Sequence, residues 1–109
     1  MPAIDASPSA LQTVVAVLER YVPDREVRAI GSRVTGAVKP FSDLDLVIMG
    51  DTPLTLRTLA ELRDALDDSD VPFVVDLIEW ASASEAFRQM IEDRSRLLRA
   101  ATAVAPAPR

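Results

Sequence analysis

The sequence predicts an α+β, two-layer domain in which a small mixed β-sheet is covered by three to four helices. Two observations support this class: segments of helical periodicity alternate with short apolar runs of strand length, and a chain of 109 residues has room for one core. Hydrophobic residues make up 49% of the chain and charged residues 27%, the balance of a folded protein. We expect one domain over residues 1–100 and a disordered, alanine- and proline-rich tail over 101–109.

The first half of the chain predicts one helix followed by two strands. Ser7 before Pro8 is a typical helix start, and apolar residues then recur at helical spacing until Pro23. A short strand is expected over 26–31. The apolar run 44–49, which lies between a serine and a glycine, is typical of a buried central strand.

The second half predicts a helix, a strand and a final helix. Thr52 before Pro53 repeats the start signal of an amphipathic helix, and residues 71–78 form an apolar run that indicates a third strand. Ser82 and Glu85 fit a capping box. The final helix is expected to bury five apolar residues: Phe87, Met90, Ile91, Leu97 and Leu98. Its arginines are expected on a solvated face: Arg88, Arg94, Arg96 and Arg99.

The composition excludes several classes of site and partner. The chain has no cysteine and no histidine, so it has no disulfide, no thiolate nucleophile and no histidine base. A net charge of -5 argues against binding duplex nucleic acid. The basic residues are almost all arginine, which suits forked contacts with phosphate. Because no apolar run is long enough to span a membrane and no signal sequence is evident, a cytoplasmic location is expected.

Two aspartates at alternate positions are the main chemical signal. Asp43 and Asp45 flank Leu44 at the start of a strand, so both carboxylates face one side with Cα atoms about 6.6 Å apart, while Leu44 faces the core. Asp76 interrupts the next apolar strand, where a carboxylate is costly to bury unless it is paired or bound to metal. Taken alone, the first two aspartates also fit a solvated strand start. Together the three carboxylates indicate a site for a hard cation such as Mg²⁺.

A glycine-containing segment precedes these aspartates. Gly31, Ser32 and Arg33 follow the predicted first strand, where a residue without a Cβ lets the backbone approach phosphate, a hydroxyl donates to it and a guanidinium adds positive charge. Gly31 and Gly36 also have the spacing of a P-loop, but Ala37 stands where that motif requires lysine. Arg33 pairing with a surface acid is the alternative interpretation.

These groups suit the transfer of a nucleoside monophosphate from a nucleoside triphosphate. In such a reaction the protein positions groups and neutralises charge on phosphate oxygens. We expect Asp43 and Asp45 to bind both ions of a two-metal site, and Asp76 to bind the ion on the acceptor side and to favour deprotonation of the attacking hydroxyl.

The paired motifs GSRVTG and SDLDL resemble those of the DNA polymerase β-like nucleotidyltransferase superfamily, in particular the minimal nucleotidyltransferases found as antitoxins beside HEPN-domain toxins. The resemblance implies a polymerase β palm-like fold, triphosphate binding by Gly31 and Ser32, metal binding by Asp43 and Asp45, and a catalytic carboxylate at Asp76. It also implies ATP and Mg²⁺ as substrate and cofactor, and a tyrosine of the toxin as acceptor. The sequence departs from the pattern at one position that bears on triphosphate binding, Thr35, where the family often has a second arginine.

Three hypotheses follow for the function. The first is an antitoxin that adenylylates a HEPN-type toxin within a hetero-oligomer, since so small a domain leaves part of the site to its partner. The second is a binding-only antitoxin or regulator that occludes its partner without turnover. The third is a transferase for a small hydroxylated acceptor such as an aminoglycoside, which the lack of a second domain makes less favourable.

Overall fold

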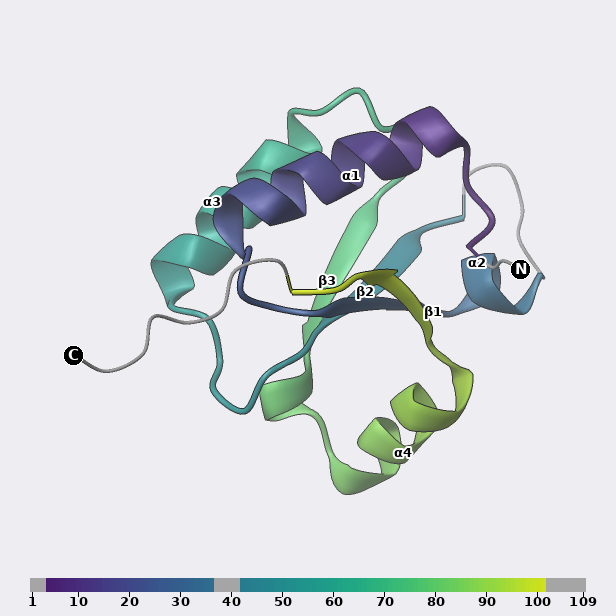
Figure 1. Cartoon of the computed structure of the whole chain (residues 1–109), viewed down its shortest axis with the longest axis vertical. Helices are drawn as coiled ribbons and strands as arrows, with labels where there is room; N and C mark the ends of the chain where they lie inside the picture. The colour runs from purple at the N-terminus through teal and green to yellow at the C-terminus, as the bar shows by residue number, and fades with distance from the viewer. Residues whose placement is uncertain (1–3, 37–41, 102–109) are drawn as a thin grey trace.

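The computed structural model describes residues 4–36 and 42–101 of the 109-residue chain (Figure 1). Ala37 and residues 102–109 of the expected tail therefore lie outside the described part. The elements are, in chain order, α1 (Pro8–Tyr21), β1 (Val27–Ile30), α2 (Ser32–Thr35), β2 (Leu44–Ile48), α3 (Leu56–Asp67), β3 (Val75–Glu79), a short 3-10 helix (Trp80–Ser82), α4 (Glu85–Arg94) and β4 (Arg96–Arg99).

The four strands form one mixed sheet in the order β3-β2-β1-β4. β1 pairs antiparallel with β2 and with β4, while β2 and β3 run parallel. This confirms the predicted mixed sheet and α+β class. β3 is shorter than the expected strand over 71–78. Val71 and Phe73 pack on the core ahead of it, and the amide of Leu44 donates to the carbonyl of Val74 at 2.9 Å, just before the regular ladder begins.

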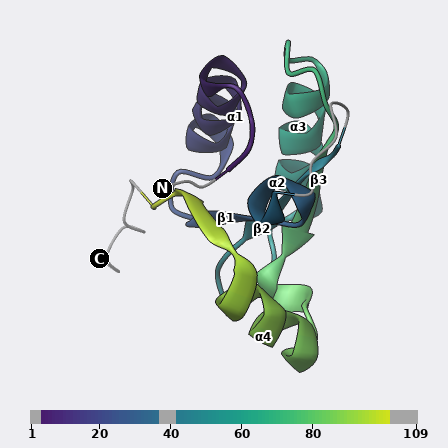
Figure 2. The same ribbon diagram turned by 90° about the vertical axis from the view of Figure 1, so that its right-hand side faces the viewer.

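Helices lie on both faces of the sheet (Figures 1 and 2). α1 and α3 cover one face, and the main core between them and the sheet contains ten buried residues: Val14, Leu18, Val22, Val27, Ala29, Leu44, Leu46, Ile48, Leu62 and Leu66. α4 lies on the opposite face, where its Ile91 packs with Ile30 and Val47 of the sheet in a smaller cluster. None of the helices among the described residues has the length and apolarity that crossing a membrane requires.

Hydroxyl caps begin the three long helices. The Ser7 side chain accepts from the amide of Ala10 at 3.2 Å at the start of α1, as predicted. The expected start of α3 at Thr52 is wrong by three residues, because Thr55 is the N-cap and accepts from Thr58. The predicted capping box at Ser82 is also wrong. Ser84 caps α4, while Ser82 closes the preceding 3-10 helix.

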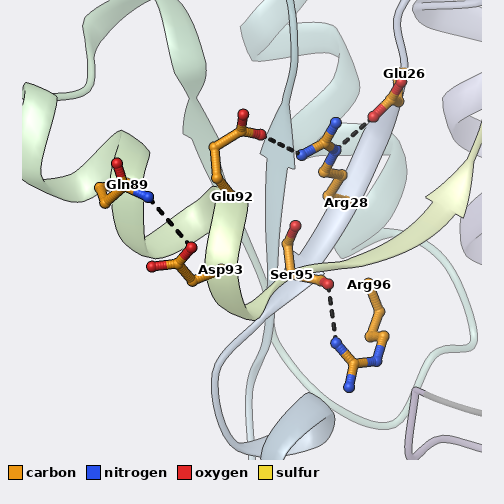
Figure 3. Close-up of polar contacts among 7 residues, drawn as sticks. All are labelled: Glu26, Arg28, Gln89, Glu92, Asp93, Ser95 and Arg96. Carbon is orange, nitrogen blue, oxygen red and sulfur yellow. Dashed lines mark hydrogen bonds and ion pairs between the residues drawn. The ribbon is translucent and has the colours of Figure 1, made fainter.

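The predicted final helix ends early and gives way to a strand. α4 stops at Arg94, and Ser95 adopts extended geometry with φ -92° and ψ 162°. The following residues pair with β1 as an edge strand, which leaves Leu97 58% exposed instead of on a buried helix face. Figure 3 shows how this region is tied to the sheet: Arg28 of β1 forms ion pairs with Glu26 and with Glu92 of α4, the latter at 3.1 Å.

Arg99 corrects the expectation of a solvated arginine face. It is only 5% exposed, and its guanidinium donates to the backbone carbonyls of Val22, Pro23 and Arg25 at 2.9–3.2 Å. These carbonyls lie in the turn between α1 and β1. The arginine therefore anchors the last strand to the first connection of the fold. Its charge is stabilised by these carbonyls and by the carboxylate of Glu19, 3.6 Å from its Nε.

Candidate active site

The structure brings two of the predicted carboxylates side by side. Asp45 of β2 and Asp76 of β3 are direct partners in the parallel ladder, so their side chains leave the same face of the sheet. Asp43 immediately precedes β2 and is exposed. Leu44 between the two β2-region aspartates is fully buried in the main core, as the alternation predicts. The carboxylates therefore lie on the face that carries α4 and away from α1 and α3.

Asp45 has a perturbed acidity. Partial burial raises the pKa of this carboxyl above its ordinary value, and the negative charges of Asp76 and Asp43 raise the pKa further, as does a hydrogen bond with Asp76. No arginine or lysine forms an ion pair with Asp45 among the described residues. Burial and repulsion thus disfavour the charged form of this side chain, and a bound cation would stabilise that form.

These carboxylates suit a hard cation by their chemistry, although they are not gathered around one point. Three carboxylates provide only oxygen donors, which Mg²⁺ prefers, and mutual repulsion at Asp45 is the electrostatic mark of a cluster that lacks counter-charge. Within 4–36 and 42–101, no three acidic side chains already have the geometry of a metal centre. Binding an ion would require the carboxylates to draw closer. Asp43 is the one freest to move, because it is exposed and lies outside the ladder that holds Asp45 and Asp76.

Asp76 is not buried among its apolar neighbours as expected. The sequence suggested a carboxylate that must be paired or metal-bound because it is buried, but Asp76 is exposed. β3 is an edge strand and only part of its outer face is covered, so the alternate residues of VVDLI face different environments. Asp76 is connected with the site by its position opposite Asp45, and not by burial.

Gly31 makes room for a carboxylate. It has φ 85° and ψ -157° as the residue before α2, a conformation that favours glycine. A Cβ at this position would lie 2.7 Å from Oδ2 of Asp45. The pairing of Ile30 with Asp45 across β1 and β2 produces this close approach. Ser32 follows at the first position of α2 and is half-buried, which places its hydroxyl group at the same end of the sheet.

Arg33 has a different environment from the one expected. It was predicted to present a positive charge to phosphate, with a surface ion pair as the alternative, but the residue is only 6% exposed. Its Nε donates to the carbonyl of Ser42 at 2.9 Å and its Nη1 to that of Asp5 at 2.6 Å. The guanidinium also stacks 4.1 Å from the ring centre of Phe73. Arg33 therefore holds together the segments around β2.

Asp45 and Asp76, but not Asp43, line an open hollow of about 600 Å³ that extends around the edge strand β3 from α4 to α3. Besides Asp45 and Asp76, it is lined by Arg63 and Asp67 of α3 and by Phe87 of α4. Sequence reasoning missed Arg63 and Phe87 as site residues. Arg63 has no signal of its own on the polar side of a helix, and Phe87 fits the pattern of a core residue, so only the packing of α3 and α4 around β3 brings them to the carboxylates.

The larger cavity of the structure lies elsewhere. An apolar groove of about 940 Å³ runs between α1 and β4 and is lined by residues such as Leu11, Val15 and Leu97. It contains none of the three aspartates. Titratable groups with a charge-coupled environment mark a reactive site better than volume does, so the smaller hollow beside Asp45 and Asp76 is the candidate active site.

Comparisons with known proteins identify the family of the chain. Residues 12–101 match the protein family described as "Polymerase beta, Nucleotidyltransferase". The chain is 43% identical over 88 residues to the probable protein adenylyltransferase MntA of Haemophilus influenzae, covering 81% of this chain and 77% of that protein.

Solved structures with the same fold include toxin-antitoxin complexes. A crystal structure of a toxin-antitoxin with AMP-PNP matches with a TM-score of 0.64 and 25% identity, covering 82% of this chain and 72% of that one. A complex of a tri-AMPylated Shewanella oneidensis HEPN toxin with its MNT antitoxin matches with a TM-score of 0.58 and 22% identity, covering 84% and 70%. The second likeness bears on the fold alone.

Proposed function

Since the chain belongs to the polymerase β nucleotidyltransferase family, we propose that it transfers AMP from ATP to a tyrosine hydroxyl of a partner HEPN-type toxin and thereby acts as its antitoxin. The observation that carries this proposal is the pairing of Asp45 with Asp76 across β2 and β3, directly beside Gly31. Relatives named as a protein adenylyltransferase and as toxin-antitoxin complexes support the choice of acceptor and of ATP.

The carboxylates divide into two roles in this proposal. Asp43, Asp45 and Asp76 would hold Mg²⁺, which supplies neutralisation of the phosphate oxygens and greater acidity of the acceptor hydroxyl. Asp76, exposed on the edge strand, faces the side from which a protein acceptor approaches and accepts the proton of its hydroxyl. Asp45 lies on the central strand between Ile30 of β1 and Asp76 of β3, so an ion bound there would lie between the bend after β1 and the acceptor side.

The bend after β1 serves the nucleotide. Gly31 leaves space for the carboxylate of Asp45, and Ser32 donates its hydroxyl to a phosphate oxygen of ATP. Arg33, itself part of this bend, ties it to the segments before α1 and β2 through its hydrogen bonds to the carbonyls of Asp5 and Ser42. The attacking hydroxyl displaces pyrophosphate from the α-phosphorus of ATP, so that AMP becomes esterified to the acceptor.

An open hollow favours work within a complex. The site has the sheet as its floor and side chains of α3 and α4 as its flanks, so a protein partner would complete its enclosure. We therefore place the chain in a hetero-oligomer with its toxin, in the cytoplasm, where ATP and Mg²⁺ are present.

The decisive experiment incubates the purified chain with its toxin, ATP and Mg²⁺ and measures the intact mass of the toxin. We expect an increase by one or more AMP units, which disappears in the Asp43→Ala and Asp45→Ala variants. Asp64→Ala is the matched control, because this exposed aspartate of α3 does not line the hollow. Absence of the adduct with the wild-type chain under saturating ATP contradicts the proposal.

A second function is favoured by one specific observation. Arg33 is committed to backbone carbonyls, and the neighbouring exposed position is Thr35, whose hydroxyl donates to the carbonyl of Ser32 at 3.5 Å. The bend after β1 thus offers few cations for a triphosphate, as in an antitoxin that neutralises its partner by occlusion alone. Such a protein would protect cells equally well when Asp43 and Asp45 are both alanine, whereas an adenylylating antitoxin would lose protection.

A further inference from the structure

The residues of the site follow one another across the sheet. Gly31 at the end of β1 approaches Asp45 of β2, and Asp45 pairs with Asp76 of β3. β3 is the edge strand, and beyond it the same hollow continues to Arg63 and Asp67 on α3. On the β1 side the hollow reaches Ile30, the residue before Gly31, and on the outer side of β3 it reaches α3. Across the sheet from β1 to β3, Gly31 comes first and Arg63 of α3 comes last.

Arg63 is a cation available for binding. It is exposed, and among the residues that the structure describes it makes no hydrogen bond or ion pair, even with Asp67 one helical turn later. Among the described residues, Arg63 is the one basic residue that lines the hollow, beside three carboxylates: Asp45, Asp67 and Asp76. These carboxylates would repel an anionic group of a partner, whereas Arg63 would attract it.

We propose that Arg63 binds a carboxylate side chain of the acceptor protein and thereby holds the acceptor at the hollow beside Asp76. This inference rests on the proposed adenylyl transfer and names a recognition contact for it. The apolar wall formed by Phe87 and Ile78 contacts the aromatic ring of the acceptor, while Arg63 fixes its flanking acidic residue. Recognition then depends on a pair, a tyrosine and a nearby carboxylate, instead of on the hydroxyl alone.

The position of Arg63 distinguishes this role from a contact with ATP. A triphosphate bound by the bend at Gly31 and Ser32 lies on the β1 side of Asp45, whereas Arg63 lies beyond Asp76 on the opposite side. Arg33, which the sequence offered as the phosphate cation, is buried and engaged with carbonyls. Loss of Arg63 is therefore expected to weaken recognition of the protein acceptor and to leave nucleotide affinity unchanged.

The test compares Arg63→Glu and Arg63→Ala with the wild-type chain in steady-state adenylylation of the toxin. Arg57→Glu is the matched control, because Arg57 is an exposed arginine on the same helix that does not line the hollow. We expect Arg63→Glu to raise the KM for the toxin by about tenfold at low salt, through loss of an attraction and gain of a repulsion. The kcat and the affinity for a non-hydrolysable ATP analogue should stay at wild-type values, and the KM difference should shrink as salt is added.

Each alternative result has a defined meaning. Equal KM values for the Arg63→Glu and Arg57→Glu variants overturn the inference, as does a loss of affinity for the ATP analogue. If the wild-type chain transfers nothing, the proposed function fails separately, and direct calorimetric binding of the toxin then decides the inference. Weaker binding by Arg63→Glu than by Arg57→Glu supports the contact, and equal binding by the two variants overturns it.

Discussion

Replacing Asp45 by asparagine is expected to stabilise the fold while it abolishes the proposed activity. Burial, together with the charges of Asp76 and Asp43, raises the pKa of Asp45 in the folded protein. A raised pKa means that the folded state binds the proton more tightly than the unfolded chain, so the free energy of unfolding falls as pH rises above the unfolded pKa of about 4. The destabilisation is thus fully present at neutral pH and absent in acid. Asparagine is neutral at every pH and removes it.

The size of the effect follows from the register. Asp45 and Asp76 are direct partners in adjacent strands, whose backbones are about 4.8 Å apart, so their charges lie at roughly 5 Å. Two like charges at that distance repel by about 0.8 kcal/mol in bulk water and by about 1.7 kcal/mol at an effective dielectric constant near 40. Because Asp45 is only partly buried and salt screens the pair, we expect Asp45→Asn to gain about 1 kcal/mol at pH 7. For a domain of this size that corresponds to a rise in Tm of about 4–8 °C.

The assay is thermal unfolding of wild type and variant between pH 3.5 and pH 8, without divalent cations and at constant ionic strength. The gain should be present at pH 7 and largely disappear near pH 3.5, below the unfolded pKa of about 3.9, where Asp45 is mostly protonated in both states of the wild type. Asp64→Asn, on the exposed side of α3, controls for the removal of one negative charge. A lower Tm for Asp45→Asn at pH 7, or a gain of the same size at both ends of the pH range, would refute the reasoning.

Three further predictions concern the glycine next to Asp45, the buried Arg99 and nucleotide affinity. Gly36→Ala places alanine at positive φ with open space around its Cβ and should cost ~1 kcal/mol in chemical denaturation. Gly31→Ala should cost more, because its Cβ would also lie 2.7 Å from Oδ2 of Asp45, and it alone should lose transfer activity; equal losses of activity in the two variants contradict this. Arg99→Met removes three hydrogen bonds from a buried guanidinium and should lower the free energy of unfolding by about 3 kcal/mol in urea denaturation, whereas a change below 1 kcal/mol argues against the anchor. Thr35→Arg adds a cation beside the bend and should tighten binding of an ATP analogue about threefold in calorimetry; unchanged or weaker binding rejects that role.

The sequence predicts elements well where local signals and packing agree. The helix that begins after Ser7 and the central strand around Leu46 combine a clear boundary with a buried apolar set, and both are present. β4 was missed because the apolar residues of RLLR continue the helical spacing of the preceding segment. Its conformation depends on pairing with β1 and on the carbonyls that Arg99 reaches, and these are contacts far away in the chain.

The same distinction applies to the candidate site. Alternation along one strand predicts that Asp43 and Asp45 share a face, and the recurrence of an isolated carboxylate in the next strand indicates Asp76. That Asp45 is directly opposite Asp76, and that Gly31 makes room for it, depends on strand register, which no local pattern specifies. Arg33 is buried although it was expected to face phosphate, and Arg63 reaches the hollow without any local signal in the sequence, because both environments depend on the packing of distant segments.

The parallel register between β2 and β3 has a consequence for mutations. Sliding one strand past the other by a single residue would turn Asp76 inward beneath α3 and push Leu77 into water, because side chains alternate between the two faces. A mutation that loosens this alignment is therefore harmful in two ways: it forces a polar group into the interior, and it separates the carboxylates of the candidate active site. Folding and the proposed chemistry thus depend on the same register, so a change in it affects both at once.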